Sequence, residues 1–368
     1  MAVAIALALI PRVALAHAEL VQSDPAADAV LESTPASVTL VFSEPVMPVG
    51  PSIRVFSPSG RQVASPVTIR ASVLSAAIDS TEAGTYIVSW QVFAADTHPS
   101  RGVFKFVVGT PSANPYAALL DAPVAGTATP VGLALQAIAR WVHFAGFALA
   151  FGVVAYGVLT RRVGPFSRLV GAGVVLLIAS EPLAVLGQLA SLSFDGDTVI
   201  AVLGSSFGRI AGLRLGAALL VWTLLATTRS WPLLAIGGAV AVLDGAAAHA
   251  IPGLPGAGQL LVAIHVAAMG LWVGGLLAFL RTPDRVFGRY AAVTLAIAVA
   301  SGFLLAVAHT RFGTALLTTE YGRVLTVKVL IVGGALAAAA LRRHRTEFAV
   351  AAIAVACATL VATLPPPT

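Results

Sequence analysis

Residues 84–108 read GTYIVSWQVFAADTHPSRGVFKFVV, two apolar runs separated by a polar stretch. Runs of β-branched and aromatic residues are typical of strands, and the polar stretch between them favours a loop. Other short runs and turn signals precede this segment, at 37–43, 52–57, 57–60, 62–70 and 82–84. About seven strands in this part of the chain predict a small β-sandwich over residues 17–110. The predicted core aromatic residues are Trp90, Phe93, Phe104 and Phe106.

The polar stretch inside this segment carries a candidate metal site. Asp96 and His98 are two residues apart, so both side chains project to the same face of an extended chain. A carboxylate and an imidazole on one face could then meet residue 17 if the first strand ends nearby. The alternative is an ordinary Asp-Thr-His-Pro turn that binds nothing.

The amino terminus has the features of a secretory signal. Residues 1–16, MAVAIALALIPRVALA, are apolar and end in small residues at Ala14 and Ala16. This pattern predicts a signal peptide cleaved after Ala16, and a retained membrane anchor is the alternative. Cleavage would give His17 a free α-amine beside its imidazole, and two nitrogen donors from one residue suit a square-planar Cu(II) site.

Composition places most of the chain in a membrane. Of the 368 residues, 58% are hydrophobic and 10% are charged, whereas soluble domains carry about 25% charged residues. Residues 1–130 hold 6 basic and 9 acidic residues, and residues 131–368 hold 16 basic and 7 acidic ones. Apolar runs separate the basic residues of the second part, a pattern of membrane topology and not of nucleic-acid binding. The single cysteine, Cys357, excludes a disulfide framework and a multi-cysteine metal site.

The second part of the chain is predicted to be an all-α membrane bundle. Residues 111–130 are rich in Pro, Ala and Thr and predict a linker. Residues 131–368 contain eight apolar runs of about twenty residues, the length that a helix needs to cross a bilayer. We therefore expect eight transmembrane helices. The runs lie near 131–159, 169–192, 210–228, 232–250, 259–280, 290–308, 324–341 and 348–364.

Arginines in alternate connections set the predicted orientation. By the positive-inside rule the connections that carry them face the cytoplasm. The first helix then starts outside, which places the N-terminal domain on the extracytoplasmic side of the cytoplasmic membrane. The arginines are Arg161, Arg162, Arg168, Arg229, Arg281, Arg285, Arg289, Arg342, Arg343 and Arg345.

Ionisable residues inside the apolar runs are costly to place in lipid, so we treat them as functional candidates. Counting residues along each helix puts four imidazoles in the outer half of the membrane, where they can gather at one level. They are His143, His249, His265 and His309. For each of them the alternative is a hydrogen bond to a neighbouring helix. Three further ionisable residues are Glu181, Asp244 and Lys328.

Other residues of the bundle have structural interpretations. Trp141 and Trp272 are expected to be interfacial or core aromatic residues, and His344 is interpreted as part of the cytoplasmic arginine cluster. Small residues, among them Gly270 and Gly274, are expected to let helices approach closely.

The first part of the chain resembles the CopC copper-binding proteins of bacterial copper resistance. The likeness is carried by AELVQSDPAADAVL after His17, by VTLVFSEPV at 38–46 and by the whole of 84–108. CopC proteins have an Ig-like sandwich, and the resemblance implies a Cu(II) site made by His17, Glu44, Asp96 and His98. Because the chain has only three methionines, we expect no methionine-rich Cu(I) site.

The membrane part resembles the CopD protein of the same copper systems. The segments that carry the likeness are RWVHFAG at 140–146, HVAAMGLWVGGLLAFL at 265–280, SGF at 301–303 and TTEYGRVLTVKVL at 318–330. The resemblance implies a fused CopC–CopD protein of copper uptake or tolerance. Copper would pass the four membrane histidines, with Glu181, Asp244 and Lys328 in supporting or proton-coupling roles.

Three functions fit these motifs. The first is a copper transporter, not an enzyme, with import favoured; without a GxxxxGK[ST] loop, ATP would not drive it directly. The second is a membrane redox protein, such as a cupric reductase, in which histidine pairs ligate haem. The pairs would be His265 with His309 or His143 with His249. The third is a sensor or scaffold. Expected partners are copper ions, the lipid bilayer and extracytoplasmic copper chaperones, and no nucleic acid.

Overall fold

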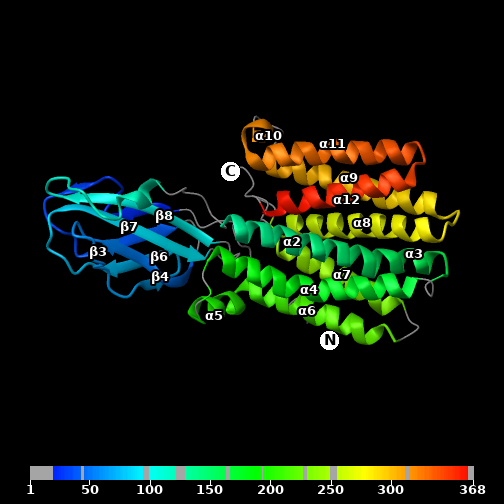
Figure 1. Ribbon diagram of the computed structural model, residues 1–368, viewed down its shortest axis with the longest axis horizontal. Coiled ribbons are helices and arrows are strands. Elements are labelled where there is room, and N and C mark those ends of the chain that lie inside the picture. The colour runs from blue at the N-terminus through cyan, green and yellow to red at the C-terminus, as the bar shows by residue number, and fades with distance from the viewer. Residues whose placement is uncertain are drawn as a thin grey trace. The chain divides into compact units, whose positions relative to one another are not determined.

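The computed structural model describes residues 20–42, 45–93, 99–121, 129–162, 166–192, 194, 196–226, 230–248, 255–310 and 315–363. These residues fall into two compact units, one built on strands and the other on long helices (Figure 1). The predicted fold class, a β-sandwich followed by a bundle of apolar helices, is confirmed.

The strand unit is a sandwich of two four-stranded sheets. In the first sheet the order is β1 (Leu20–Asp24), β3 (Ser37–Phe42), β6 (Val73–Ala77) and β5 (Thr68–Arg70). In the second it is β2 (Val30–Leu31), β8 (Pro99–Val108), β7 (Gly84–Phe93) and β4 (Met47–Phe56). β2 and β8 are parallel, and the other neighbouring pairs are antiparallel.

The two runs of 84–108 form the paired strands β7 and β8, in register from Gly84 opposite Val108 to Phe93 opposite Pro99. The aromatic residues predicted to form the core are all buried. Trp90 meets the Phe42 ring edge-on at 5.1 Å between centroids. Gly102 lies opposite Trp90, and a Cβ added there would come within 2.6 Å of the indole. The sandwich core therefore requires a glycine at this position of β8.

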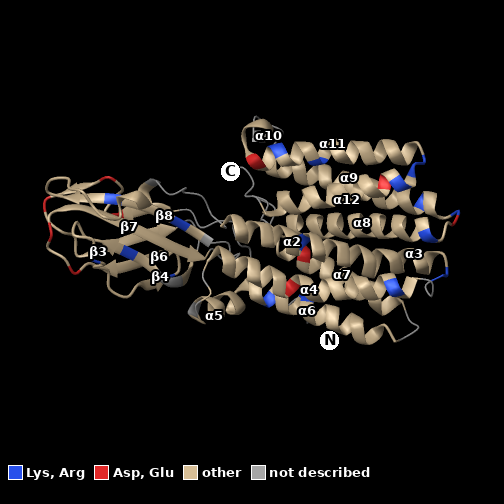
Figure 2. Ribbon diagram, viewed as in Figure 1, with Lys and Arg blue, Asp and Glu red and all other residues tan. Residues whose placement is uncertain are grey.

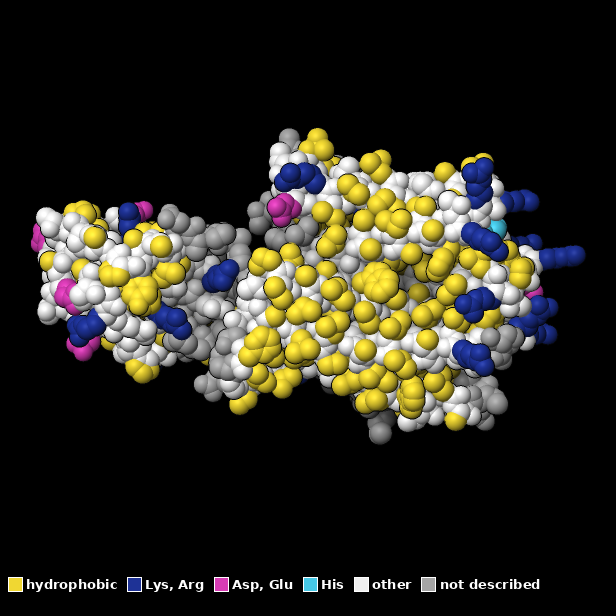
Figure 3. Space-filling model, viewed as in Figure 1, with side chains coloured by type: hydrophobic (Ala, Val, Ile, Leu, Met, Phe, Trp, Pro, Cys, Tyr) yellow, Lys and Arg dark blue, Asp and Glu magenta, His cyan; other side chains and the backbone are white. Residues whose placement is uncertain are grey.

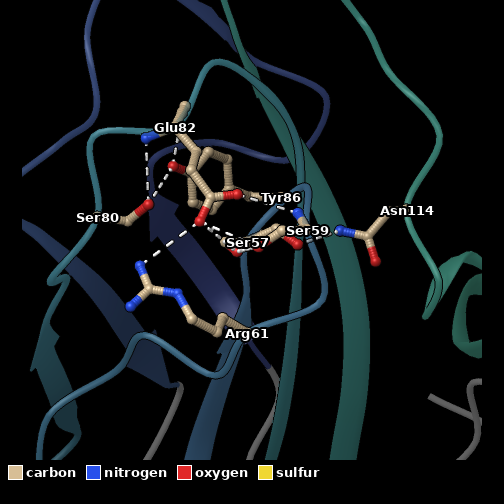
Figure 4. A network of polar contacts seen from close by, with 7 residues as sticks. All are labelled: Ser57, Ser59, Arg61, Ser80, Glu82, Tyr86 and Asn114. Atoms are coloured by element: carbon tan, nitrogen blue, oxygen red, sulfur yellow. Dashed lines mark hydrogen bonds and ion pairs between the residues drawn. The ribbon is translucent and has the colours of Figure 1, made fainter.

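A polar network joins the two predicted turns of the sandwich (Figure 4). The Glu82 carboxylate accepts hydrogen bonds from the Ser59 hydroxyl at 3.1 Å, the Ser59 N–H at 3.0 Å and the Ser57 hydroxyl at 3.0 Å, and Arg61 lies 3.5 Å away. These hydrogen bonds, those of Ser59 first, lower the pKa of Glu82 below its usual 4.5. The Tyr86 hydroxyl donates to the Glu82 carbonyl at 2.6 Å, so the start of β7 is tied to the same loop.

Residues 111–121, which the sequence places in the linker, pack onto the sandwich. Asn114 is buried, and its Nδ2 donates to the Ser57 and Thr85 carbonyls, both at 2.9 Å. The Tyr116 ring stacks on Phe56 at 3.9 Å. This segment ends in a short 3-10 helix, η1 (Ala117–Asp121).

The helix unit contains a helix at each of the eight predicted apolar runs. Seven are long and apolar enough to cross a membrane, and α7, with 16 residues, is shorter. The helices are α2 (Pro130–Phe147) continued by η2 (Ala148–Gly152) and α3 (Val153–Leu159), then α4 (Ser167–Ser191), α6 (Ser206–Leu224), α7 (Trp231–Ala246), α8 (Pro255–Arg281), α9 (Phe287–Thr310), α11 (Glu320–Ala340) and α12 (His344–Thr363). Of two further short helices, α10 (Ala315–Thr318) belongs to this unit, and α5 (Gly196–Gly204) is grouped with the strand unit.

The surface of the helix unit suits lipid. Figure 3 shows apolar side chains along the helices, and Figure 2 shows basic residues gathered at the end of the unit near α3. Leu220, Phe303 and Leu330 are 51%, 59% and 71% exposed. Nine of the ten arginines assigned to cytoplasmic connections are described, and all nine are exposed. An apolar belt of this extent needs lipid around it.

Helix α8 packs against α2, η2, α3, α7, α9 and α12. Small residues allow the closest of these approaches. A Cβ added to Gly274 would collide with the Ala148 carbonyl, and one added to Gly152 would collide with the Gly270 carbonyl. The prediction that Gly270 and Gly274 let helices come close together is confirmed. The partner in this contact is η2, a single π-helical turn.

Candidate functional site

His143 in α2 lies between two carboxylates from other helices. Its Nδ1 is 3.1 Å from Oε1 of Glu181 in α4, and its Nε2 is 3.0 Å from Oδ1 of Asp244 in α7. The three side chains are 7%, 5% and 4% exposed. The Ser180 hydroxyl donates to Glu181 at 3.2 Å. The sequence marks His143, Glu181 and Asp244 as candidates, but it does not predict that they meet.

One arginine adds positive charge beside this group. Arg214 in α6 places its Nη2 2.6 Å from Oδ1 of Asp244. Arg140, one turn before His143, donates instead to the Ala362 carbonyl in α12. Sequence reasoning missed Arg214. The signal that could have found it is a charged residue in the middle of an otherwise apolar helix.

Both ring nitrogens of His143 are therefore engaged. An ionised carboxylate only accepts hydrogen bonds, so a ring nitrogen that faces one carries a proton. In this arrangement no lone pair of the His143 ring is directed at a metal ion. The cluster is arranged to hold protons and charge.

His265 in α8 has a different environment. Its Nδ1 lies 3.0 Å from the Ala298 carbonyl and 3.1 Å from the Ser301 hydroxyl, both in α9. Since a carbonyl only accepts, Nδ1 donates and Nε2 keeps its lone pair. Gly302 makes room for the ring, because a Cβ there would lie 2.8 Å from the His265 Cε1.

His309 at the end of α9 shares this pattern. Its Nδ1 lies 2.9 Å from the Leu305 carbonyl, one turn back in the same helix, which leaves Nε2 free to accept. The Tyr321 ring of α11 lies 6.0 Å from the His309 ring between centroids. Within the described residues, no hydrogen bond or ring contact joins His143, His265 and His309 to one another.

Lys328 in α11 lies near His265 and not in the cluster of His143, Glu181 and Asp244, which we call the His143 cluster. It interacts electrostatically with His265 in α8 and with Cys357 in α12. All three side chains are partly buried. The three helices α8, α11 and α12 thus bring an imidazole, an amine and a thiol into one region.

Sequence reasoning also missed Glu347, at the start of α12. Its side chain is 1% exposed, and its Oε1 accepts a hydrogen bond from the Trp272 indole N–H at 3.1 Å. Its Oε2 lies 2.9 Å from Nδ1 of His344. The His344 ring meets Phe279 and Phe287 edge-on. His344, interpreted from the sequence as a topology signal, is thus a partner of a buried carboxylate, and Trp272 is a core residue.

The remaining predicted ligands lie outside the described residues. They are His17, Glu44, Asp96 and His98 of the expected Cu(II) site and His249 of the expected membrane path. Within the described part of the chain, no group of three or more His, Cys, Asp or Glu is placed to hold a metal ion. The Cu(II) site therefore stays a prediction.

Comparison with known families assigns both halves of the chain. Residues 20–109 match the CopC domain family, and residues 129–257 match a family described as copper resistance protein D-like, N-terminal domain. The chain is a CopC domain followed by a CopD-like N-terminal domain. Its CopC domain is the sandwich, and its CopD-like region makes it a multi-pass membrane protein. The His143 cluster lies inside the CopD-like match, whereas His265 and His309 lie beyond its end.

Individual relatives cover different parts of this CopC–CopD chain. Copper transport protein CutJ of Bacillus subtilis (strain 168) is 25% identical over 88% of this chain, which spans 66% of the length of CutJ. Protein YobA of Escherichia coli (strain K12) is 31% identical over 98 residues, 25% of this chain and 79% of YobA.

Two solved structures are similar to the CopC domain. CopC from Methylosinus trichosporium OB3b is 28% identical and covers 27% of this chain and 100% of its own, with a TM-score of 0.24. PcoC, a methionine-rich copper resistance protein from Escherichia coli, is 30% identical and covers 26% of this chain and 100% of its own, with a TM-score of 0.23.

Proposed function

We propose that this CopC–CopD chain is a copper transporter of the cytoplasmic membrane. Its sandwich lies on the extracytoplasmic side and binds Cu(II), and its helices carry copper inward. The family assignment supports this function, as does the likeness to CutJ, which is named a copper transport protein. Exposed arginines at one end of the bundle support the orientation by the positive-inside rule. In this proposal the chain is a transporter and not an enzyme.

The observation that carries the proposal is the ring geometry of His265 and His309. A histidine that binds a metal commonly donates its other ring N–H to a backbone carbonyl, which fixes the ring and leaves one lone pair for the ion. His265 and His309 both donate from Nδ1 to a carbonyl, at 3.0 and 2.9 Å. Neutral imidazole accepts copper in either oxidation state. We assign these two side chains and His249 to the copper path.

In this proposal copper binds first to the sandwich. The proposed ligands are the α-amine and imidazole of His17, the Glu44 and Asp96 carboxylates and the His98 imidazole. Nitrogen and oxygen donors of this kind suit Cu(II). The acidic balance of residues 1–130 adds attraction for a cation. Copper carriers outside the membrane are the expected donors.

Copper uptake by a His265→Asn variant tests the membrane path. Asparagine keeps an N–H close to the position of Nδ1, where it can still donate to the Ala298 carbonyl, but it has no counterpart of Nε2. We expect copper uptake into proteoliposomes to be lost in this variant. The matched control is Ser301→Ala, which removes the hydroxyl near Nδ1 and should keep uptake. Full uptake by His265→Asn, or net export by the wild type, would overturn the proposal.

A second candidate function is a haem- or copper-dependent membrane redox protein, such as a cupric reductase. The same two Nε2 lone pairs favour it, because paired imidazoles are common haem ligands. An optical spectrum of the purified protein separates the two functions. If the wild type shows a Soret band that disappears in His265→Ala and in His309→Ala, the assigned function becomes electron transfer and not transport.

A further inference from the structure

Three buried side chains form a continuous hydrogen-bonded chain across three helices. It runs from Glu181 in α4 through His143 in α2 to Asp244 in α7, and the two nitrogen–oxygen distances are 3.1 and 3.0 Å. Each of the two contacts needs one proton, held either by the ring nitrogen or by the carboxylate oxygen opposite it. Glu181, His143 and Asp244 therefore share two protons.

Moving one of these protons from one of the three side chains to another leaves their net charge unchanged. With both protons on the ring, an imidazolium faces two carboxylates, and the sum is one negative charge. With one proton on a carboxylate, a neutral ring lies between a carboxylic acid and a carboxylate, and the sum is the same. A proton shift that creates no new net charge avoids most of the cost of charging a buried site. The geometry is that of a proton relay.

The two ends of the relay are not equivalent. Asp244 faces a fixed cation, because Arg214 lies 2.6 Å from its Oδ1. Glu181 accepts from His143 and from the Ser180 hydroxyl, and within the described residues no arginine or lysine pairs with it. A permanent positive charge favours the ionised form of a carboxylate, so Asp244 is held as the anion. Glu181 is the end at which a proton is gained or lost.

The surrounding charge balances the site while it holds that proton. The charged or polar side chains paired with His143 and Asp244 come from α4, α6 and α7. With the ring protonated, one imidazolium and the Arg214 guanidinium stand beside two carboxylates. The site with the proton is therefore electrically neutral, and the site without the proton carries one negative charge.

We propose that this cluster is a proton-exchange site that couples proton movement to copper movement. Glu181 takes up and releases the proton, His143 shares it with Glu181, and Asp244 with Arg214 is the fixed counter-charge. In the exchange step one proton passes between the Glu181–His143 contact and water, and no electrons move. The assignment of copper as the cargo rests on the proposed function, whereas the proton site does not.

Infrared difference spectra of the full-length protein between acidic and alkaline buffer test the proton site without copper. We expect a carbonyl band of a protonated carboxyl group that changes with pH and is absent in Glu181→Gln. Glutamine has the same shape, and its oxygen can still accept from the His143 ring. Glu320→Gln, which removes an exposed carboxylate at the start of α11, is the matched control and should keep the band. A pH-dependent band that survives Glu181→Gln, or no such band in the wild type, would overturn the inference.

Proteoliposomes with a trapped pH indicator test the coupling. We expect a copper gradient to drive proton movement through the wild type and through Glu320→Gln, and no proton movement through Glu181→Gln. Copper movement without protons in the wild type would overturn the coupling and leave the copper transporter in place. If the wild type moves no copper, the proposed function fails, and the infrared spectra still decide whether Glu181 exchanges a proton.

Discussion

His143 Nε2 and Asp244 Oδ1 lie 3.0 Å apart, although 101 residues separate them in the chain. The contact joins α2 to α7, and Arg214 brings α6 to the same carboxylate. Glu181 adds α4 on the other side of the ring. These contacts connect α2, α4, α6 and α7, four helices inside the CopD-like N-terminal match, and the carboxylates and the imidazole that make them are buried.

Removing the central anion should destabilise the helix unit. Asp244→Asn leaves Arg214 without its counter-charge and removes one of the two carboxylates that face His143, and losing one partner of a buried ion pair costs about 3–5 kcal/mol. We expect a marked fall in thermal unfolding temperature in detergent. Glu320→Gln, at an exposed carboxylate at the start of α11, should behave as the wild type. Equal stability of the two variants would contradict the role given to Asp244.

Helix packing at the contact of η2 with α8 should tolerate no side chain on Gly274. In Gly274→Ala the new methyl group collides with the Ala148 carbonyl, so the helices must separate. Overpacking of this kind costs about 1–3 kcal/mol. The control is Gly216→Ala in α6, where an added Cβ meets nothing within 4 Å. Size-exclusion profiles and thermal unfolding of the two variants measure the difference.

The hydroxyl of Tyr86 should stabilise the sandwich. Tyr86→Phe keeps the buried ring but removes the hydrogen bond to the Glu82 carbonyl, which we expect to cost about 1 kcal/mol in the free energy of unfolding. Tyr116→Phe keeps its stack on Phe56 and serves as the control, with no loss expected. Denaturant unfolding of the sandwich, followed by Trp90 fluorescence, reports both values.

Stability of the sandwich should fall in acid because of Glu82. The folded state holds the pKa of Glu82 below 4.5, so it favours the ionised carboxylate. The resulting stabilisation is fully present at neutral pH, above the pKa of the unfolded state, and is lost as the pH falls through the lower pKa of the folded state. Thermal melts of the wild type and Glu82→Gln should differ at pH 7 and converge towards pH 3. A difference in melting temperature between the two proteins that grows in acid would contradict a lowered pKa of Glu82 in the folded state.

Copper binding by the sandwich should depend on a free amine at His17. We expect the mature domain to bind Cu(II) and a form with extra residues before His17 to bind it more weakly, because that form lacks the α-amine donor. His98→Ala and Asp96→Ala should abolish binding while the sandwich stays folded. Titration with Cu(II), with near-ultraviolet circular dichroism as the folding control, measures each case. Unchanged affinity in the extended form would remove the amine from the ligand set.

The sequence alone predicted the main elements of this fold and their types. The two apolar runs of 84–108 form the paired strands β7 and β8, the turn signals at 57–60 and 82–84 are tied together by Glu82, and a helix forms at every predicted apolar run. These features follow from local patterns: the alternation of a strand, the conformational preferences of turn residues and the length of an apolar run. The described residues contain eight strands; β1, β2 and β6 lie outside the short runs that the sequence marks, and β2, with only two residues, is too short to give a pattern.

Only the tertiary structure decided which buried polar groups meet. The sequence marks His143, Glu181 and Asp244 as unusual because they lie in apolar helices, yet it treats His143 and His265 alike. In the structure the first lies between carboxylates, and the second donates to a carbonyl. The physical reason is that a membrane helix is apolar on every side, so its sequence does not reveal which face packs against a neighbour. The rotation of each helix, set by side-chain packing, determines the partners of each buried charge.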